Sequence, residues 1–98
     1  MLKKSYSKTG AACRVTFKYE NEEQAETAVL AGDFNDWSLQ ATPMKKLKDG
    51  SFSATLSLPA GQNYRFRYVL DGGVWVNDTA ADGYAPNEFG EANSVLAL

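Results

Sequence analysis

The segment NYRFRYVLDGGVWVN (63–77) decides the fold, because it encodes two strands joined by a tight turn. Aromatic or aliphatic residues occupy every even position from 64 to 70, and they alternate with Asn63, Arg65, Arg67 and Val69, of which the first three are polar or basic. A period of two is typical of a strand with one face in a core and one face in water. The triplet DGG (71–73) supplies residues that tolerate tight-turn backbone angles. The segment therefore predicts an antiparallel hairpin.

The length of the hairpin loop determines which face Trp75 occupies. With a three-residue loop, the opposed pairs are Leu70 with Val74, Val69 with Trp75, and Arg67 with Asn77. Opposed residues share a face, so Trp75 then lies on the outer face near Arg67. A two-residue loop would instead push Trp75 inward and turn Val74 and Val76 outward. We prefer the three-residue loop because it keeps both valines in the core; a partly buried Trp75 is the alternative.

The same alternation recurs along the chain. It appears in CRVTFKY (13–19) and SFSATLSL (51–58), and the terminal NSVLAL (93–98) is typical of a short strand. The turn segments KDG (48–50) and PAGQ (59–62) separate these runs. Strands of this length and spacing predict an all-β, immunoglobulin-like antiparallel β-sandwich of about seven strands. Residues 12–98 are expected to form one domain, and the polar residues 1–11 are expected to be loosely held.

Composition excludes several classes of protein. The chain has 98 residues, ten basic and twelve acidic, with 44% hydrophobic residues. This balance argues against a nucleic-acid-binding surface and against a disordered acidic chain. No run approaches the roughly 20 apolar residues of a membrane helix, and the first residues do not resemble a secretory signal. With a single cysteine, Cys13, no internal disulfide can form, and we predict a cytoplasmic protein without a membrane partner.

The reactive residue types are sparse. There is no histidine, and Cys13 alternates with core residues, so it is predicted to be buried and structural. The aspartates considered as catalytic pairs or calcium ligands are Asp33, Asp36, Asp71, Asp78 and Asp82. Nothing in their spacing brings two of them to the separation of a glycosidase pair, and no calcium loop is visible. The sequence predicts no enzyme activity, no metal site and no cofactor.

The stretch DFNDW (33–37) places a tryptophan in a polar turn after the strand-like run TAVLAG (27–32). Such a residue either folds back into the core or is displayed to a ligand. We predict that Phe34 returns to the core and that Trp37 points outward. Gly32 is expected to permit the bend at the strand end, and Asn35 is expected to hold the turn.

An exposed indole near a guanidinium is suited to binding a sugar. The C–H face of a pyranose packs on an aromatic plane, while Arg and Asn side chains donate hydrogen bonds to its hydroxyls. Trp and Arg are also common in the centres of protein–protein interfaces. The outer face of the 63–77 hairpin therefore suggests either a carbohydrate site or a protein-docking site.

Several segments, in order, resemble carbohydrate-binding module family 48. They are VLAGDFNDWS (29–38), DGSFSATLSLPAGQNYRFRYVLDGGVWVND (49–78) and PNEFGEANSVLAL (86–98). This family includes the glycogen-binding domain of the AMP-activated kinase β subunit and the N-terminal early-set domains of isoamylases and glycogen-branching enzymes. The resemblance covers roughly residues 12–98. It implies an early-set, immunoglobulin-like β-sandwich that binds α-1,4-glucans such as glycogen or starch.

The resemblance also implies which residues bind carbohydrate: Trp37, Arg67, Trp75, Phe89 and Asn93. The two tryptophans match the family's sugar-stacking platforms, and Asn93 matches a hydroxyl-binding position. Arg67 and Phe89 stand where kinase members carry lysine and leucine. Glu91 stands where the kinase domain has a small hydroxyl residue. The kinase domain also has one residue fewer in the loop before its second tryptophan.

These features predict a non-catalytic module that binds α-1,4-glucans by aromatic stacking and polar contacts. The alternative is a protein-interaction module on the same fold, docking onto a partner such as a glycogen-metabolism enzyme.

Overall fold

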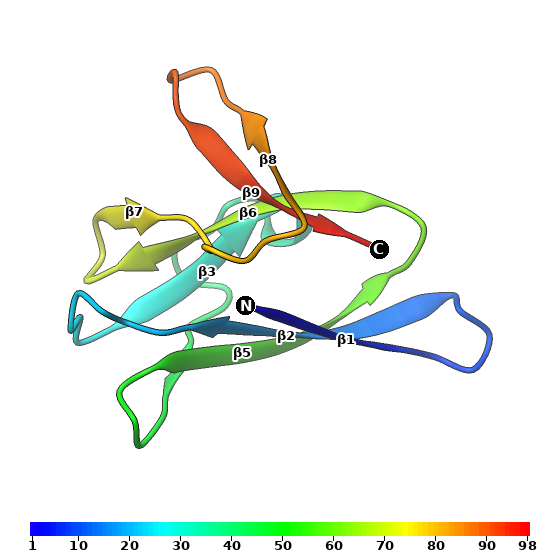
Figure 1. The fold of residues 1–98 in the computed structure, drawn as a ribbon, viewed down its shortest axis with the longest axis horizontal. Helices are drawn as coiled ribbons and strands as arrows, with labels where there is room; N and C mark the ends of the chain where they lie inside the picture. The colour runs from blue at the N-terminus through cyan, green and yellow to red at the C-terminus, as the bar shows by residue number, and fades with distance from the viewer.

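The strands of the computed structural model, which describes all 98 residues, form two antiparallel sheets packed as a sandwich (Figure 1). The first sheet has the order β1 (Leu2–Tyr6), β2 (Ala12–Tyr19), β5 (Phe52–Pro59), β4 (Lys45–Lys46). The second has the order β3 (Ala28–Gly32), β6 (Asn63–Leu70), β9 (Ala92–Ala97), β8 (Gly83–Pro86), and β7 (Val74–Val76) also pairs with β6. A short 3-10 turn, Asp33–Asn35, follows β3. The predicted all-β sandwich is confirmed.

The strand count is nine rather than about seven. Alternation did not reveal β1, β4 and β8, which are short or polar. Residues 1–11 were expected to be loosely held, yet Leu2–Tyr6 pairs with β2 along its whole length, and Lys4 forms an ion pair with Asp82 at 2.7 Å. One partly buried leucine in five residues is too weak a pattern to indicate a strand without its neighbour.

The core lies between the two sheets and contains the residues that alternation assigned to it. Its largest fully buried members are Phe17, Phe52, Phe66 and Tyr68, and Cys13 is also fully buried. The rings of Phe17 and Phe66 meet edge to face at 5.2 Å, which joins β2 of one sheet to β6 of the other. This packing joins the two sheets and leaves Asn63 and Arg65 on the outer face of β6 exposed to water.

The hairpin of β6 and β7 has the predicted three-residue loop. Leu70 pairs with Val74 and Val69 with Trp75, and Trp75 is 40% exposed. The prediction for Val74 is wrong, because its side chain is 55% exposed at the hairpin end. Conversely, Val69 is buried although it lies on the outer face. Val69 is flanked on that face by its two cross-strand partners, Val29 and Trp75, which together cover it.

One buried polar contact joins β6 to the chain after β7. The hydroxyl of Tyr68 donates a hydrogen bond to the Asp78 carboxylate at 2.7 Å, and both side chains are almost fully buried. Burial raises the pKa of the Tyr68 hydroxyl well above its ordinary value of about 10, and the negative charge of Asp78 raises it further. Tyr68 therefore stays neutral in the folded state when the unfolded chain has begun to ionise.

This shift predicts a loss of stability in base. Above pH 10 the unfolded chain releases the phenolic proton while the folded chain keeps it, so the free energy of unfolding falls as the pH rises. The contribution of Tyr68 should reach about 1.4 kcal/mol per pH unit above that point. Urea unfolding near pH 9 and near pH 11 should show a smaller fall in Tyr68→Phe than in wild type. An equal fall in both proteins would contradict the assignment.

The structure has no helix of the length and apolar character needed to cross a membrane.

Candidate functional site

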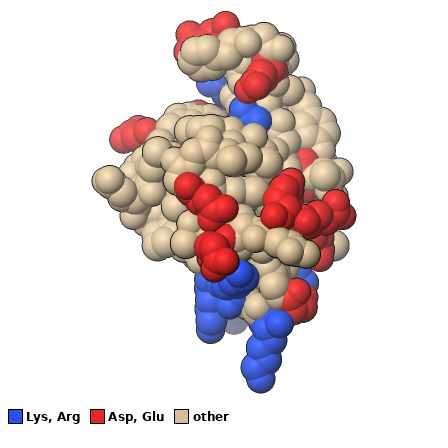
Figure 2. Space-filling view, turned by 90° about the vertical axis from the view of Figure 1, so that its left-hand side faces the viewer, with Lys and Arg blue, Asp and Glu red and all other residues tan.

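A groove of about 750 Å³ lies at one end of the second sheet. Its lining residues are Trp37, Arg65, Arg67, Trp75, Pro86, Asn87, Glu88, Phe89, Glu91 and Asn93. All five residues that the sequence analysis assigned to carbohydrate binding are among them. In Figure 2 the tip of the β8–β9 hairpin projects from the body of the domain, and the surface is hollowed between them.

The groove exists because β6 changes partner along one edge. From Asn63 to Phe66 it pairs with β9, and from Tyr68 to Leu70 it pairs with β7. Arg67 lies at the change. Beyond this point β9 leaves the sheet together with β8 as a two-stranded arm, which Figure 1 shows rising away from β7. The groove therefore lies between β7 and the arm, with residues of β6 also lining it.

Trp37 is placed by a tightly bonded turn after β3. The Asn35 side chain donates to the Leu30 carbonyl at 2.9 Å and to Thr42 Oγ1 at 3.0 Å, and it accepts the Gly32 N–H. Two successive residues in the left-handed region, Asp36 (φ 56°) and Trp37 (φ 59°), then reverse the chain. Asn35 therefore holds the turn, as predicted.

Phe34 returns to the core, with its ring 5.7 Å from that of Phe17, as predicted. The role of Gly32 differs from the expected one. Its backbone is extended (φ −172°), so no special conformation requires glycine. A Cβ at this position would instead lie 2.6 Å from the carbonyl oxygen of Arg65 and 2.8 Å from the Phe34 ring. Close approach of β3 to β6, rather than a bend, excludes a side chain.

The two tryptophans form an inclined aromatic pair. Their ring centroids are 6.4 Å apart and the planes are 34° from parallel. The indole N–H of Trp37 donates to Asp33 Oδ1 at 3.1 Å, and Asp33 Oδ2 accepts the backbone N–H of Arg65 at 2.8 Å. Asp33 thus ties the Trp37 ring to β6, so both indoles are held by elements of the same sheet.

The Arg67 side chain is largely buried and is not exposed to solvent as an outer-face position would suggest. Only 12% of it is exposed. One terminal nitrogen donates to Glu91 Oε2 at 2.9 Å, the other donates to the Trp75 carbonyl at 3.2 Å, and Nε is buried without an acceptor. The guanidinium therefore links β7 to the β8–β9 arm across the split.

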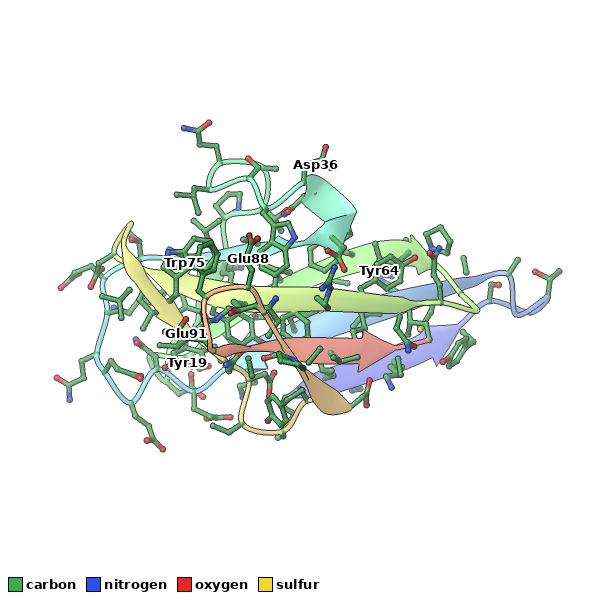
Figure 3. The ribbon with its side chains drawn as sticks, turned by 90° about the horizontal axis from the view of Figure 1, so that it is seen from above. Tyr19, Asp36, Tyr64, Trp75, Glu88 and Glu91 are labelled. Atoms are coloured by element: carbon green, nitrogen blue, oxygen red, sulfur yellow. The ribbon has the colours of Figure 1, made fainter.

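The arm contributes an apolar tip and polar groups behind it. Phe89 at the tip is 80% exposed. The Asn87 side chain accepts the backbone N–H groups of Phe89 and Glu91 at 3.0 and 3.1 Å, which fixes the turn. Asn87 also donates to Asn93 Oδ1 at 3.3 Å, and Asn93 is 8% exposed. Figure 3 shows that Trp75, Glu88 and Glu91 lie at the same part of the domain.

Four lining residues were not singled out from the sequence: Arg65, Pro86, Asn87 and Glu88. Arg65 had a signal, because it lies two residues before Arg67 and so shares its face of β6. The other three belong to the arm, whose first strand alternation did not reveal.

The charges of the groove cancel. Arg65 and Arg67 oppose Glu88 and Glu91 among the lining residues, so the groove has no formal net charge. No three acidic or thiol side chains in the structure gather where they could hold a metal ion. An aromatic, polar and electrically neutral groove suits a neutral, hydroxyl-rich ligand better than an anion or a cation.

A comparison with protein-family models matches residues 7–85 to carbohydrate-binding module 48 (isoamylase N-terminal domain). The matched span includes Trp37, Arg67 and Trp75 and ends within the arm, before Phe89 and Asn93. A search of curated proteins found no match. Since the family model covers most of the chain and the fold is a two-sheet sandwich, the chain belongs to the carbohydrate-binding module 48 family.

Proposed function

We propose that this protein binds α-1,4-glucans, such as glycogen, starch or maltooligosaccharides, without acting on them chemically. The observation that carries the proposal is the inclined pair of Trp37 and Trp75 in one groove with the exposed Phe89. Glucose rings present apolar C–H faces that pack on indole planes. An α-1,4-linked chain follows a curved path, so two platforms inclined by 34° can stack on two successive parts of it.

The polar groups of the groove complement the sugar rim. Asn93 and Glu91 line the groove with the two indoles and offer a donor and an acceptor to hydroxyl groups. The absence of net charge in the lining favours a neutral polysaccharide.

The placement of the acids supports a non-catalytic role. Glycosidases flank the scissile bond with two carboxyl groups. Here Glu88 and Glu91 both belong to the arm on one wall of the groove, and Glu91 is paired with Arg67.

The expected affinity for a short glucan is weak. Burying about 300 Å² of apolar surface at ~25 cal/mol per Å² yields roughly 7 kcal/mol. Association costs of at least about 4 kcal/mol offset much of this. The remainder corresponds to dissociation constants on the order of millimolar, with tighter apparent binding to a branched polymer that engages several copies.

An amide and indole chemical-shift titration with maltoheptaose tests the proposal. We expect the largest shifts at both indole N–H signals and at the residues that line the groove. Cellohexaose, which has β-1,4 linkages and a straighter chain, is the control and should cause smaller changes. Absence of shifts at millimolar maltoheptaose would reject glucan binding. A specific co-purifying protein partner, such as a glycogen-metabolism enzyme, would then assign the exposed aromatics to protein docking.

A further inference from the structure

We infer that Glu91, rather than Arg67, hydrogen-bonds the sugar, and that Arg67 acts by holding Glu91 in place. The inference rests on the proposed glucan binding and assigns the polar roles within that groove. It reverses the roles expected from the sequence, where Arg67 was the ligand-binding residue and Glu91 was a departure from the family pattern.

The first argument is that Arg67 has few donors left to offer. Its side chain is 12% exposed, and its two terminal nitrogens already donate to Glu91 and to the Trp75 carbonyl. The remaining nitrogen, Nε, is buried without an acceptor. A sugar hydroxyl would have to displace one of these contacts or reach a nearly enclosed group.

The second argument is that Glu91 presents a free acceptor. Its side chain is 62% exposed, and within the protein only Oε2 accepts a hydrogen bond, from Arg67. A carboxylate can accept about four hydrogen bonds, so most of its capacity remains for a ligand. Sugar hydroxyls are donors, and hydrogen bonds to an ionised acceptor are shorter and stronger than those between neutral groups.

The third argument is that Glu91 is held before the ligand arrives. Its backbone N–H donates to Asn87 Oδ1 at 3.1 Å, and its carbonyl accepts the Asn87 N–H at 3.0 Å. The ion pair with Arg67 restrains the side chain as well. A group fixed in this way loses little conformational freedom on binding.

Asn93 completes the arrangement. It lies two residues after Glu91, it also lines the groove, and its Oδ1 is occupied by Asn87. The Asn93 amide N–H₂ forms no hydrogen bond within the protein, which leaves an unpaired donor in the same groove as the acceptor of Glu91. Neighbouring hydroxyls of one glucose, each of which both donates and accepts, suit this pair.

The decisive experiment is a maltoheptaose titration of Glu91→Ala. If Glu91 binds the sugar, removing it weakens binding by about tenfold, the usual effect of losing a charged hydrogen bond. The control Glu26→Ala removes the same charge from an exposed residue outside the groove and should bind like wild type. Unchanged or tighter binding by Glu91→Ala would overturn the inference, because it would mean that freeing Arg67 creates a better donor. Since Glu91 is exposed, its variant should keep the wild-type amide spectrum.

The role of Arg67 is tested by comparing Arg67→Lys and Arg67→Met. Lysine keeps a positive charge beside Glu91 and should retain most of the binding, whereas methionine should weaken it as much as Glu91→Ala does. In the Glu91→Ala background, Arg67→Met should cause no further loss. A further, additive loss would show that Arg67 contacts the sugar directly and would overturn its assignment as a positioning residue. If Arg67→Met does not fold, Arg67→Gln, which also removes the positive charge, takes its place in both backgrounds.

The experiments distinguish a failure of the Glu91 assignment from a failure of the proposed glucan binding. If wild type binds maltoheptaose but Glu91→Ala binds equally well, only the polar assignment is wrong. If wild type does not bind maltoheptaose at all, both the proposed function and this inference are wrong.

Discussion

Replacing both tryptophans, Trp37→Ala with Trp75→Ala, is expected to abolish measurable glucan binding while leaving the domain folded. Both indoles line the groove, and their ring centroids lie 6.4 Å apart. Truncating a large aromatic at the centre of a binding surface costs about 2 kcal/mol or more, which is roughly 30-fold in affinity. From a millimolar starting point, loss of either platform makes binding difficult to detect, and loss of both removes it. The measurement is co-sedimentation with glycogen together with a maltoheptaose titration.

A matched control is available in Tyr6→Ala. Tyr6 is an exposed aromatic, 50% accessible, on β1 and outside the groove. This variant should bind glycogen as wild type does. Thermal unfolding of the double tryptophan variant should remain cooperative, because Trp75 is 40% exposed and Trp37 is only partly buried. Wild-type affinity in a folded double variant would place the sugar site elsewhere.

Gly32→Ala is expected to be the most destabilising single-methyl substitution in the chain. The new Cβ would lie 2.6 Å from the Arg65 carbonyl oxygen, which is backbone in a paired strand and cannot move away freely. Forcing β3 and β6 apart also disturbs the Phe34 ring, which packs against Phe17. Overpacking of this kind costs about 3 kcal/mol at the upper end of its usual range. For a domain of this size, each kcal/mol lowers the melting temperature by roughly 4–8 °C.

Gly73→Ala is the control for the added methyl group. Gly73 has no neighbour within 4 Å of the added carbon and does not have a positive φ. Its substitution should change the melting temperature by no more than about 3 °C, within the usual range of surface changes. Equal effects at the two glycines would show that the contact between β3 and β6 is not the cause.

The sequence predictions differ from the structure where the pairing or burial of a residue is set by a neighbouring element and not by its own strand. Alternation in residues 64 to 70 identified the inward residues of β6, and the DGG loop identified the partner of Trp75. The same reasoning assigned Val74 to the core from its parity with Val76, whereas Val74 is exposed at the hairpin end. It also missed β1 and β8, whose pairing depends on the strands that they join rather than on an apolar pattern of their own.

The candidate site also has features that the sequence predicted and features that only the structure showed. The sequence alone determined that Trp75 and Arg67 share an outer face, because side chains on a strand alternate with a period of two and opposed residues share a face. Through the resemblance to family 48 it also singled out Trp37, Phe89 and Asn93 as expected site residues. Only the tertiary structure decided that these residues line one groove, since that depends on where β9 leaves β6 and how far the arm stands from β7. It likewise revealed that Glu91 forms an ion pair with Arg67. The two residues are 24 positions apart, so their contact depends on how the arm packs against β6 and not on the sequence pattern of either element.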